Sequence, residues 1–452
     1  GPGSRRNRSA KAAATVQKGT CGRNRGVKRK LAWTTEDRII GTLLFAPEKA
    51  EPLIARGLPG RNAAEDPRVR PPDWPSLVEK AGREGVAAAL FHNIRAHRLE
   101  ALVPTESLED LSGLYYANLK RNLTIAAALR PVLDALAGAA VPCIVLKGIA
   151  LAERVYPSIA IRGMSDVDLL VRKDDLQKAD ACLSALDYAP LDSTASSAIH
   201  NPAGYLASLE YGKDPPSPLN LHLHWHPVNT SVPASAFIEG IDLDRIWEKA
   251  VPVPLSDSRA LMLCPEHLIA CLCEHALRVG HSFDRLILVC DIYFAIRRCE
   301  NGIDWDDVAA ESRRIGLHRF AWHGLEIVRG YTDLPIPQTC LAQLKPPDLT
   351  AGERLFLRLQ RDNRRIRGSS YFVYLALNRG LFAKTGLFLR TLFPPGQILR
   401  QRSRIQHSEV GGFNRLSRTR EVCSQVMKLI LGDYARPDEN RLPDSDLSLR
   451  RR

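Results

Sequence analysis

The amino-acid sequence predicts an α+β protein, with a small mixed sheet flanked by helical N- and C-terminal regions. Apolar residues recur at helical spacing through residues 31–138. In residues 139–232 the pattern changes to short apolar runs separated by turn residues, which is typical of strands. Helical spacing returns in residues 233–345 and continues in a basic segment, residues 346–435. The chain of 452 residues is long enough for two or three domains, since one core holds roughly 250–300 residues.

Both ends of the chain are predicted to be disordered. Residues 1–30 hold ten Lys or Arg and no acid, and residues 436–452 are polar and charged. Residues 1–4 resemble the remnant of a removed expression tag. We exclude both ends from the predicted fold.

Cysteine usage and hydropathy predict a cytoplasmic protein. The ten cysteines are scattered from Cys21 to Cys423 without paired CxxC motifs. We therefore expect reduced, mostly buried thiols and no structural zinc site. The sequence has no uninterrupted run of about 18 apolar residues, so no membrane-spanning helix is expected. No apolar segment follows the basic N-terminus, so a secretory signal is not expected there.

The N-terminal helical region is expected to contain several amphipathic helices. One begins at Trp74, a second runs from Thr105 to Leu123, and a third covers Ala126 to Ala139. Pro131 lies inside the third. Because proline lacks a backbone N–H, Pro131 is expected to start a new turn or to kink the helix.

The central region reads as strands that alternate with helices. Strands are expected at residues 141–146, 166–171, 188–191, 204–211 and 219–225, and helices at 149–155 and 173–186. The chain then returns to helices, expected at residues 265–280, 285–298, 305–315 and 317–330.

The C-terminal segment is strongly basic. Residues 353–420 hold fifteen Lys or Arg against three acids. This composition fits four uses. They are a solvated helix face, a surface that binds the acceptor or a triphosphate, a contact with nucleic acid, and a contact with a membrane surface. Among the functional uses we favour acceptor or triphosphate binding by Arg364, Arg365 and Arg367. Nucleic-acid binding is expected to be weak at most, and lost near physiological salt.

Asp166 and Asp168 are the main candidates for chemistry. Side chains alternate along a strand, so the two carboxylates point the same way, roughly 6.6–7 Å apart. Like charges that close repel unless a cation lies between them. Magnesium fits best, because it takes few carboxylates and is completed by waters and substrate phosphates. The pattern predicts a site for Mg²⁺, or Mn²⁺, at Asp166 and Asp168.

Four neighbouring residues are candidates for binding a nucleotide. Gly148 allows a tight turn between strand and helix, and Lys147 and Arg162 can reach phosphates. Ser165 lies next to the acids. We do not expect it to act as a nucleophile, because no His/Asp relay is visible. A phosphate-binding turn beside a metal-binding strand is typical of phosphoryl or nucleotidyl transfer.

These motifs resemble a little-characterised bacterial family of nucleotidyltransferases in the DNA polymerase beta-like superfamily. The resemblance covers roughly residues 70–330. It rests on Leu146 to Leu151, Tyr156-Pro157, Arg162, Asp166 to Val171, Leu223-His224-Trp225, Pro265-Glu266, His275, residues 285–291 and Ile303-Asp304-Trp305. It implies the polymerase beta-like fold, an NTP donor, in particular ATP, and two-metal chemistry. A peptide, protein or small-molecule acceptor is also implied.

The sequence departs from this family at one position. The family tends to place a third carboxylate two residues before the His of the His-Trp motif, where this chain has His222. Alternation along the strand places Asn220, His222, His224 and His226 on one face. His222 is therefore a candidate catalytic residue, as a metal ligand or a base. Equally, it can mark a weakened second-metal site, and Glu210 is a spare carboxylate nearby.

The sequence leaves three function classes, of which the third is a membrane-surface protein that acts through the aromatic and basic residues 371–393. The first is a Mg²⁺-dependent nucleotidyltransferase that moves an NMP, in particular AMP, to an acceptor and releases pyrophosphate. The second is a catalytically degenerate nucleotide- or nucleic-acid-binding protein, which His222 and the basic segments favour. Release of pyrophosphate distinguishes the first two.

Overall fold

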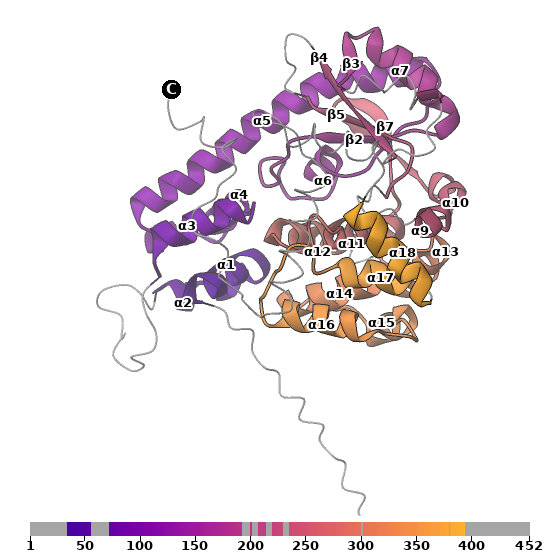
Figure 1. Cartoon of the computed structure of the whole chain (residues 1–452). Coiled ribbons are helices and arrows are strands. Elements are labelled where there is room, and N and C mark those ends of the chain that lie inside the picture. The colour runs from indigo at the N-terminus through magenta and orange to yellow at the C-terminus, as the bar shows by residue number, and fades with distance from the viewer. Residues whose placement is uncertain are drawn as a thin grey trace, which may run out of the picture.

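The computed structural model describes residues 34–55, 72–191, 199–200, 207–213, 219–228, 235–299, 302–378 and 380–393. The predicted tails, residues 1–30 and 436–452, lie outside this part of the chain. Figure 1 shows a sheet at one end of the molecule, a long helix that runs past it, and a group of C-terminal helices below it. The fold is therefore mixed α and β, as the sequence predicts.

Within the described residues, seven strands form one mixed sheet in the order β3-β4-β5-β2-β1-β7-β6. Their bounds are β1 Ile144–Val145, β2 Val167–Leu170, β3 Tyr188–Pro190, β4 Ser208–Lys213, β5 Leu221–His224, β6 Val251–Leu255 and β7 Ser258–Met262. Strand β2 pairs antiparallel with β1 and parallel with β5, so it lies near the middle of the sheet. All four β2 residues are buried, which matches their apolar run.

The sheet extends beyond the expected core of residues 139–232. The hairpin of β6 and β7 follows that core, and β7 pairs in parallel with β1. Pro252 and Pro254 lie in β6, the last strand of the sheet. Proline has no backbone N–H to donate to a neighbouring strand, so within a sheet it is tolerated mainly at the edge. The two prolines therefore hide the sequence pattern by which a strand is usually predicted. The helical prediction for residues 233–345 is wrong over this hairpin.

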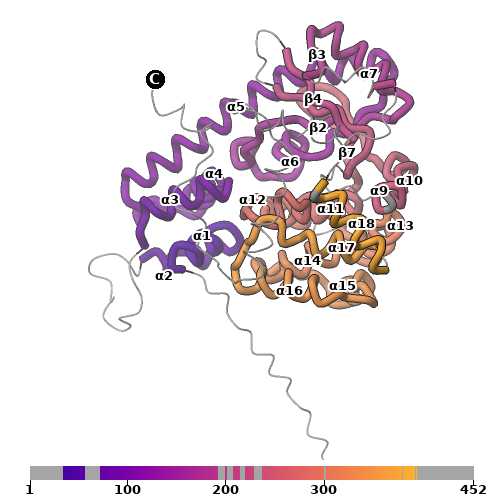
Figure 2. The backbone as a smooth tube through the Cα atoms, viewed as in Figure 1, coloured from indigo at the N-terminus to yellow at the C-terminus, as the bar shows by residue number. Residues whose placement is uncertain are grey.

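One long helix joins the N-terminal helices to the sheet. Helix α5 (Thr105–Gly138) packs against α3 (Trp74–Arg83) and α4 (Ala87–Ala96) at one end and against β7 at the other. Figure 2 shows it as a single continuous tube. The two helices predicted from Thr105 to Leu123 and from Ala126 to Ala139 are therefore one helix, and Pro131 does not start a new one. The Pro131 ring is exposed, so the helix continues past it with one hydrogen bond fewer.

The remaining N-terminal and central helices are short. They are α1 Thr35–Phe45, η1 Pro47–Lys49, α2 Glu51–Ala55, η2 Glu100–Leu102, α6 Ile149–Arg154, η3 Lys173–Asp175, α7 Leu176–Ser184, α9 Ser235–Glu239 and α10 Leu243–Glu248. Helix α6 follows directly on the turn after β1, and α7 packs on β3 and α5. The helices expected at residues 149–155 and 173–186 are thus present.

The C-terminal helices form a second packed region. They are α11 Pro265–Leu277, α12 Leu286–Cys299, α13 Trp305–Arg314, α14 His318–Tyr331, α15 Gln338–Leu344, α16 Ala351–Arg361, α17 Tyr371–Leu377 and α18 Leu381–Leu392. Helix α11 contacts α12, α13 and α14, which places it at the centre of this region. No helix in the described part of the chain is both long and apolar enough to cross a membrane.

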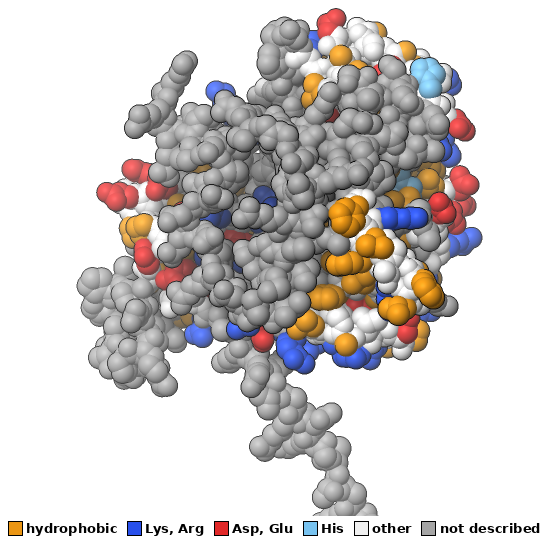
Figure 3. Space-filling model, viewed as in Figure 1, with side chains coloured by type: hydrophobic (Ala, Val, Ile, Leu, Met, Phe, Trp, Pro, Cys, Tyr) orange, Lys and Arg blue, Asp and Glu red, His pale blue; other side chains and the backbone are white. Residues whose placement is uncertain are grey.

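Helix α18 exposes an apolar surface. Figure 3 shows hydrophobic side chains gathered on the face of the molecule where α17 and α18 lie. The most exposed are Leu381 and Phe382, at 78% and 95%, and Phe388, Leu389 and Phe393 are also exposed. The membrane-surface use of residues 371–393 stays a prediction.

Candidate metal and nucleotide site

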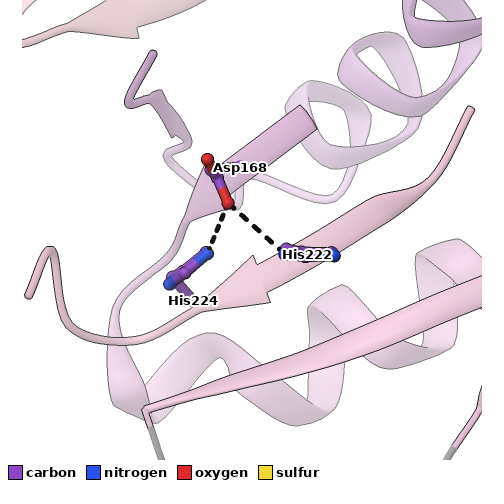
Figure 4. A group of neighbouring side chains, drawn as sticks. All are labelled: Asp168, His222 and His224. Carbon is purple, nitrogen blue, oxygen red and sulfur yellow. Dashed lines mark hydrogen bonds and ion pairs between the residues drawn. The ribbon is translucent and has the colours of Figure 1, made fainter. Parts of the chain in front are cut away.

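The register of three strands creates a row of chemically active side chains. The parallel pairing of β2 and β5 sets Asp168 opposite His222 and Leu170 opposite His224. The antiparallel pairing of β4 and β5 sets Glu210 opposite His222. Residues two apart on a strand share a face, so Asp168, His222, His224 and Glu210 all lie on one face of the sheet. Figure 4 shows both histidines directed toward Asp168.

Asp168 is the centre of this group and is only 3% exposed. Its Oδ1 lies 2.8 Å from Nε2 of His224, and its Oδ2 accepts a hydrogen bond from Nζ of Lys147. Burial alone would raise the pKa of Asp168. The charge of Lys147, together with the hydrogen bonds from His222 and His224, outweighs burial and holds that pKa well below its ordinary value. Asp168 is therefore ionised at neutral pH.

Asp166 approaches the same point from just before β2. Its Oδ1 accepts a hydrogen bond of 2.9 Å from the Ser165 hydroxyl. Its Oδ2 lies 3.7 Å from Nδ1 of His222, and Oδ1 of Asp168 lies 3.6 Å from that same nitrogen. One oxygen of each carboxylate is thus directed toward His222, while the other oxygen has a separate partner.

The two histidines differ in their surroundings. His224 is buried, and burial, the largest influence, lowers its pKa. His222 is partly exposed, and its Nε2 lies 3.6 Å from Oε1 of Glu210. Burial would lower the pKa of His222, but Asp168, Asp166 and Glu210 together raise it. Donor atoms of Asp168, His222 and His224 all lie within 4.8 Å of one another, a spacing that can hold a metal ion.

Gly148 brings the turn after β1 against the Asp166 backbone. Its φ is +61°, a region that L side chains rarely adopt. A Cβ at this position would lie 3.3 Å from the carbonyl oxygen of Asp166. The Lys147-Gly148 turn therefore needs glycine both for its backbone angle and for its close approach. Lys147, Gly148 and Ser165 therefore lie beside the two carboxylates, and their role in nucleotide binding stays a prediction.

Arg162 does not reach the site. It is buried, and its Nε and Nη2 donate to the two oxygens of Asp291 in α12, at 2.8 and 2.9 Å. The Tyr156 hydroxyl donates to the same carboxylate. Asp291 thus engages the Nε–Nη2 edge of the guanidinium, while Nη1 lies 3.5 Å from the Gly163 carbonyl. These contacts argue against the predicted phosphate contact of Arg162. Arg162 fixes the loop before β2 instead, and Asn122 of α5 supports that loop through the Arg162 carbonyl.

The end of α11 lies beside the site and adds positive charge. Arg278 donates to the carbonyl of Pro227, just beyond β5. Burial and then the positive charges of Arg278, Lys147, Arg285 and Arg367 lower the pKa of His281 to about 3. Arg367, from the segment between α16 and α17, donates to the carbonyl of Gly280 at 2.6 Å. We name Lys147, Arg278, Arg285 and Arg367 the basic rim.

Sequence reasoning missed part of this arrangement. The rim comes from three separate segments of the chain, because Arg278 and Arg285 both lie between α11 and α12, and no local pattern joins these segments. Glu210 was noted only as a spare carboxylate, because its position opposite His222 depends on the pairing of β4 with β5. His226 was expected on the same face as His222, but it lies past the end of β5, with its ring nitrogens near the carbonyls of Val228 and Ile238.

Comparison with known proteins identifies one family. The model of a family described as an uncharacterised nucleotidyltransferase matches residues 70–333, which is more than half of the chain. The matched range includes the whole sheet, the carboxylates, the histidines and all of the basic rim except Arg367. No curated protein and no solved structure matches the chain.

Proposed function

Because the chain belongs to the family of uncharacterised nucleotidyltransferases, we propose that it transfers an NMP from a nucleoside triphosphate to an acceptor. The donor we favour is ATP, so that the acceptor receives AMP and pyrophosphate is released. We also propose that the fold is a bacterial variant of the polymerase beta-like nucleotidyltransferase fold. The mixed sheet, with its two acids on a central strand next to a Lys-Gly turn, supports this assignment.

The observation that carries the proposal is the approach of Asp166 and Asp168 to one point. One oxygen of each lies within 3.7 Å of Nδ1 of His222. Carboxylate oxygens are the ligands that Mg²⁺ prefers, and two of them are usual at sites completed by substrate phosphates. The residues present therefore fit a divalent cation held by Asp166 and Asp168. When bound, that cation supplies positive charge against the triphosphate.

The chain's own residues account for the other requirements of transfer. We assign Lys147, which bonds Asp168, to the outer phosphates. The other rim residues add positive charge near His281, although Arg278 is itself paired with Glu274. The acceptor nucleophile forms a bond to the α-phosphorus. The bond from that phosphorus to the β-phosphate oxygen breaks, and its electron pair leaves with pyrophosphate. Positive side chains near the leaving group stabilise the charge that develops on it.

The acceptor is proposed only by chemical class. A peptide, a protein or a small molecule with a free nucleophile fits the family resemblance. Tight nucleic-acid binding is not part of the proposal, because the basic rim is small. It draws on four basic side chains, and two of them already donate to backbone carbonyls.

Asp166→Asn and Asp168→Asn test the proposal directly. Each variant is expected to lose at least about 100-fold of the transfer rate while remaining folded, because removing a metal ligand costs several kcal/mol of transition-state stabilisation. The measurement uses each α-labelled NTP with Mg²⁺ and a cell extract, and scores labelled product and pyrophosphate. Asp174→Asn, an exposed acid just after β2, is the matched control.

Two results would contradict the proposal. Wild-type turnover in folded Asp166→Asn or Asp168→Asn would remove these carboxylates from the chemistry. Nucleotide binding by the wild type without any pyrophosphate release, across all four NTPs, would instead support the degenerate binding protein. The ion pair of Lys147 with Asp168 is the feature that favours that alternative.

A further inference from the structure

We infer that the metal site includes His222 and His224 as ligands, and that it therefore selects a first-row transition-metal dication over Mg²⁺. The ligand set is Asp166, Asp168, His222 and His224, which we name the mixed-ligand site. The inference rests on the proposed function, because it specifies the metal of the same site. It can be tested separately from nucleotidyl transfer, because metal binding by these ligands is measured without catalytic turnover.

The spacing of the donor atoms suits one ion. Oδ1 of Asp168 lies 2.8 Å from Nε2 of His224 and 3.6 Å from Nδ1 of His222. Oδ2 of Asp166 lies 3.7 Å from the same Nδ1. Ligands bonded at about 2.0–2.2 Å to one ion are separated by roughly 3–3.6 Å. Small side-chain rotations would therefore bring the donors of Asp168, His222 and His224 to a common ion. Asp166 approaches the same group through its contact with His222.

The remaining carboxylate oxygens are already bound elsewhere. Oδ1 of Asp166 accepts from Ser165, and Oδ2 of Asp168 accepts from Lys147. Each acid thus offers a single oxygen to the centre of the group. Lys147 can keep its contact with Asp168 while Oδ1 binds an ion, so the ion pair does not exclude the metal.

Glu210 lies close enough to His222 to hydrogen-bond its second ring nitrogen after a small side-chain rotation. A histidine that binds a metal through one nitrogen commonly directs the other at a carboxylate, which fixes the ring and its tautomer. Nε2 of His222 lies 3.6 Å from Oε1 of Glu210, on the side away from Asp168. The cross-strand pairing of Glu210 with His222 holds this arrangement in the sheet. Glu210 is therefore a positioning residue for the site.

His224 has less support than His222. Its Nδ1 is buried and has no hydrogen-bond partner among the described residues. Its Nε2 already faces Asp168, and its place in the sheet interior restricts its movement. We therefore expect both histidines to bind the ion, with the larger loss on removal of His222.

The donor types decide which ion is preferred. Mg²⁺ takes oxygen ligands and releases its waters reluctantly. Imidazole nitrogen suits zinc, copper, iron and nickel, and affinities rise along the first-row series. Two imidazoles and two carboxylates therefore favour an ion of this class, with Co²⁺ and Zn²⁺ as suitable probes.

The test is metal binding by the full chain without any nucleotide. Metal-stripped protein is titrated with Co²⁺, Zn²⁺ and Mg²⁺ by calorimetry, and the Co²⁺ complex is followed by its visible spectrum. We expect one Co²⁺ per chain, bound at least about 100-fold more tightly than Mg²⁺. His222→Ala and His224→Ala should each weaken Co²⁺ and Zn²⁺ binding at least tenfold and change Mg²⁺ binding little. Glu210→Gln should weaken Co²⁺ binding by about 10- to 100-fold.

The control is His97→Ala, which removes an exposed histidine at the end of α4 and should leave all three affinities unchanged. Pulsed EPR of the wild type with Mn²⁺ covers the case in which a variant misfolds, since an imidazole ligand gives a nitrogen coupling. Absence of that coupling, or equal Co²⁺ affinity in folded His222→Ala and the wild type, overturns the inference.

The outcomes separate this inference from the proposed function. A chain that binds Co²⁺ through imidazole but releases no pyrophosphate keeps the inference and refutes the nucleotidyl transfer. A chain that releases pyrophosphate with Mg²⁺, and whose metal affinities do not depend on His222 or His224, keeps the transfer and refutes the inference.

Discussion

At the scale of single residues, Lys147 is a cation that bonds directly to Asp168, the central carboxylate of the site. It follows β1, and the Gly148 turn holds it next to Asp168. The side chain is about four-fifths buried, with 16% of its surface exposed. A partly buried lysine next to one carboxylate can also bind a second anion that lies near that carboxylate. A triphosphate bound to a metal at Asp168 would be such an anion.

We expect Lys147→Ala to weaken NTP binding more than NMP binding. The loss for the triphosphate should be about 10- to 100-fold, because hydrogen bonds to charged groups contribute about 1.5–3 kcal/mol. The monophosphate lacks the outer phosphates and should lose little. Calorimetry with ATP and AMP measures both, and Lys173→Ala, an exposed lysine after β2, is the control. An equal loss for ATP and AMP would place Lys147 at the α-phosphate or outside the site.

At the scale of elements, the sequence predicts what local patterning determines. The apolar runs at 141–146 and 166–171 correspond to β1 and β2, and the two acids lie at the start of the second run. The hairpin of β6 and β7 was not predicted, because Pro252 and Pro254 interrupt its pattern at the sheet edge. The sequence predicts two helices, from Thr105 to Leu123 and from Ala126 to Ala139, where the structure has the single helix α5, which also runs past Pro131.

Strand register explains the rest of what the sequence could not show. His224 and Glu210 join Asp168 only because β5 pairs with both β2 and β4. Nothing in a single sequence specifies those pairings, since a shift by one residue would turn every side chain to the opposite face. Arg162 was misassigned for a related reason. Its partner Asp291 lies 129 positions away, in α12.

The basic segment contains a second arginine whose partner is distant in the sequence. Arg365 was expected to bind an acceptor or a triphosphate. Its Nη1 and Nη2 instead donate to the two oxygens of Glu84, at 2.5 and 2.6 Å, and both side chains are 12% exposed. This pair joins the segment after α16 to the end of α3. The assignment of Arg365 to ligand binding is therefore wrong, and only Arg367 of the three arginines is placed in the basic rim.

We expect Arg365→Ala to destabilise the fold by about 3 kcal/mol, because it leaves the Glu84 carboxylate without its partner in a mostly buried place. Turnover per folded molecule should be unchanged. Chemical denaturation measures the stability, with Arg361→Ala as a control, since Arg361 is exposed at the end of α16 and should change stability by less than about 0.5 kcal/mol. A stable Arg365→Ala variant with slow transfer would restore the ligand-binding role.

At the scale of the whole molecule, buried ion pairs connect elements that are distant in sequence. Arg162 with Asp291 joins the loop before β2 to α12, and Arg365 with Glu84 joins the C-terminal region to α3. Glu311 of α13 does the same for α10 and α11. It accepts from Nε and Nη2 of Arg245 at 3.0 and 2.7 Å and lies 2.9 Å from Nε2 of His267. Such contacts make the packing of the C-terminal helices sensitive to acid.

Glu311 provides the test of this acid sensitivity. Its hydrogen bonds with Arg245, the largest influence, lower its pKa to about 2 from the ordinary 4.5. A carboxyl with a depressed folded-state pKa stabilises the fold above its unfolded-state pKa, and this contribution is lost as pH falls through the folded-state value. The contribution of Glu311 should therefore be complete above pH 4.5 and disappear between pH 4.5 and 2.

We expect Glu311→Gln to reduce the free energy of unfolding at pH 7, because it removes the carboxylate charge that pairs with Nε and Nη2 of Arg245. The difference from the wild type should shrink as pH falls from 4.5 toward 2, since protonation removes the same charge from the wild type. Urea denaturation at pH 7, 4 and 3 measures both effects. Glu79→Gln, an exposed acid on α3, should show neither. A difference that stays constant over this range would show that the carboxylate charge of Glu311 does not hold α10, α11 and α13 together, and that its contribution comes from packing alone.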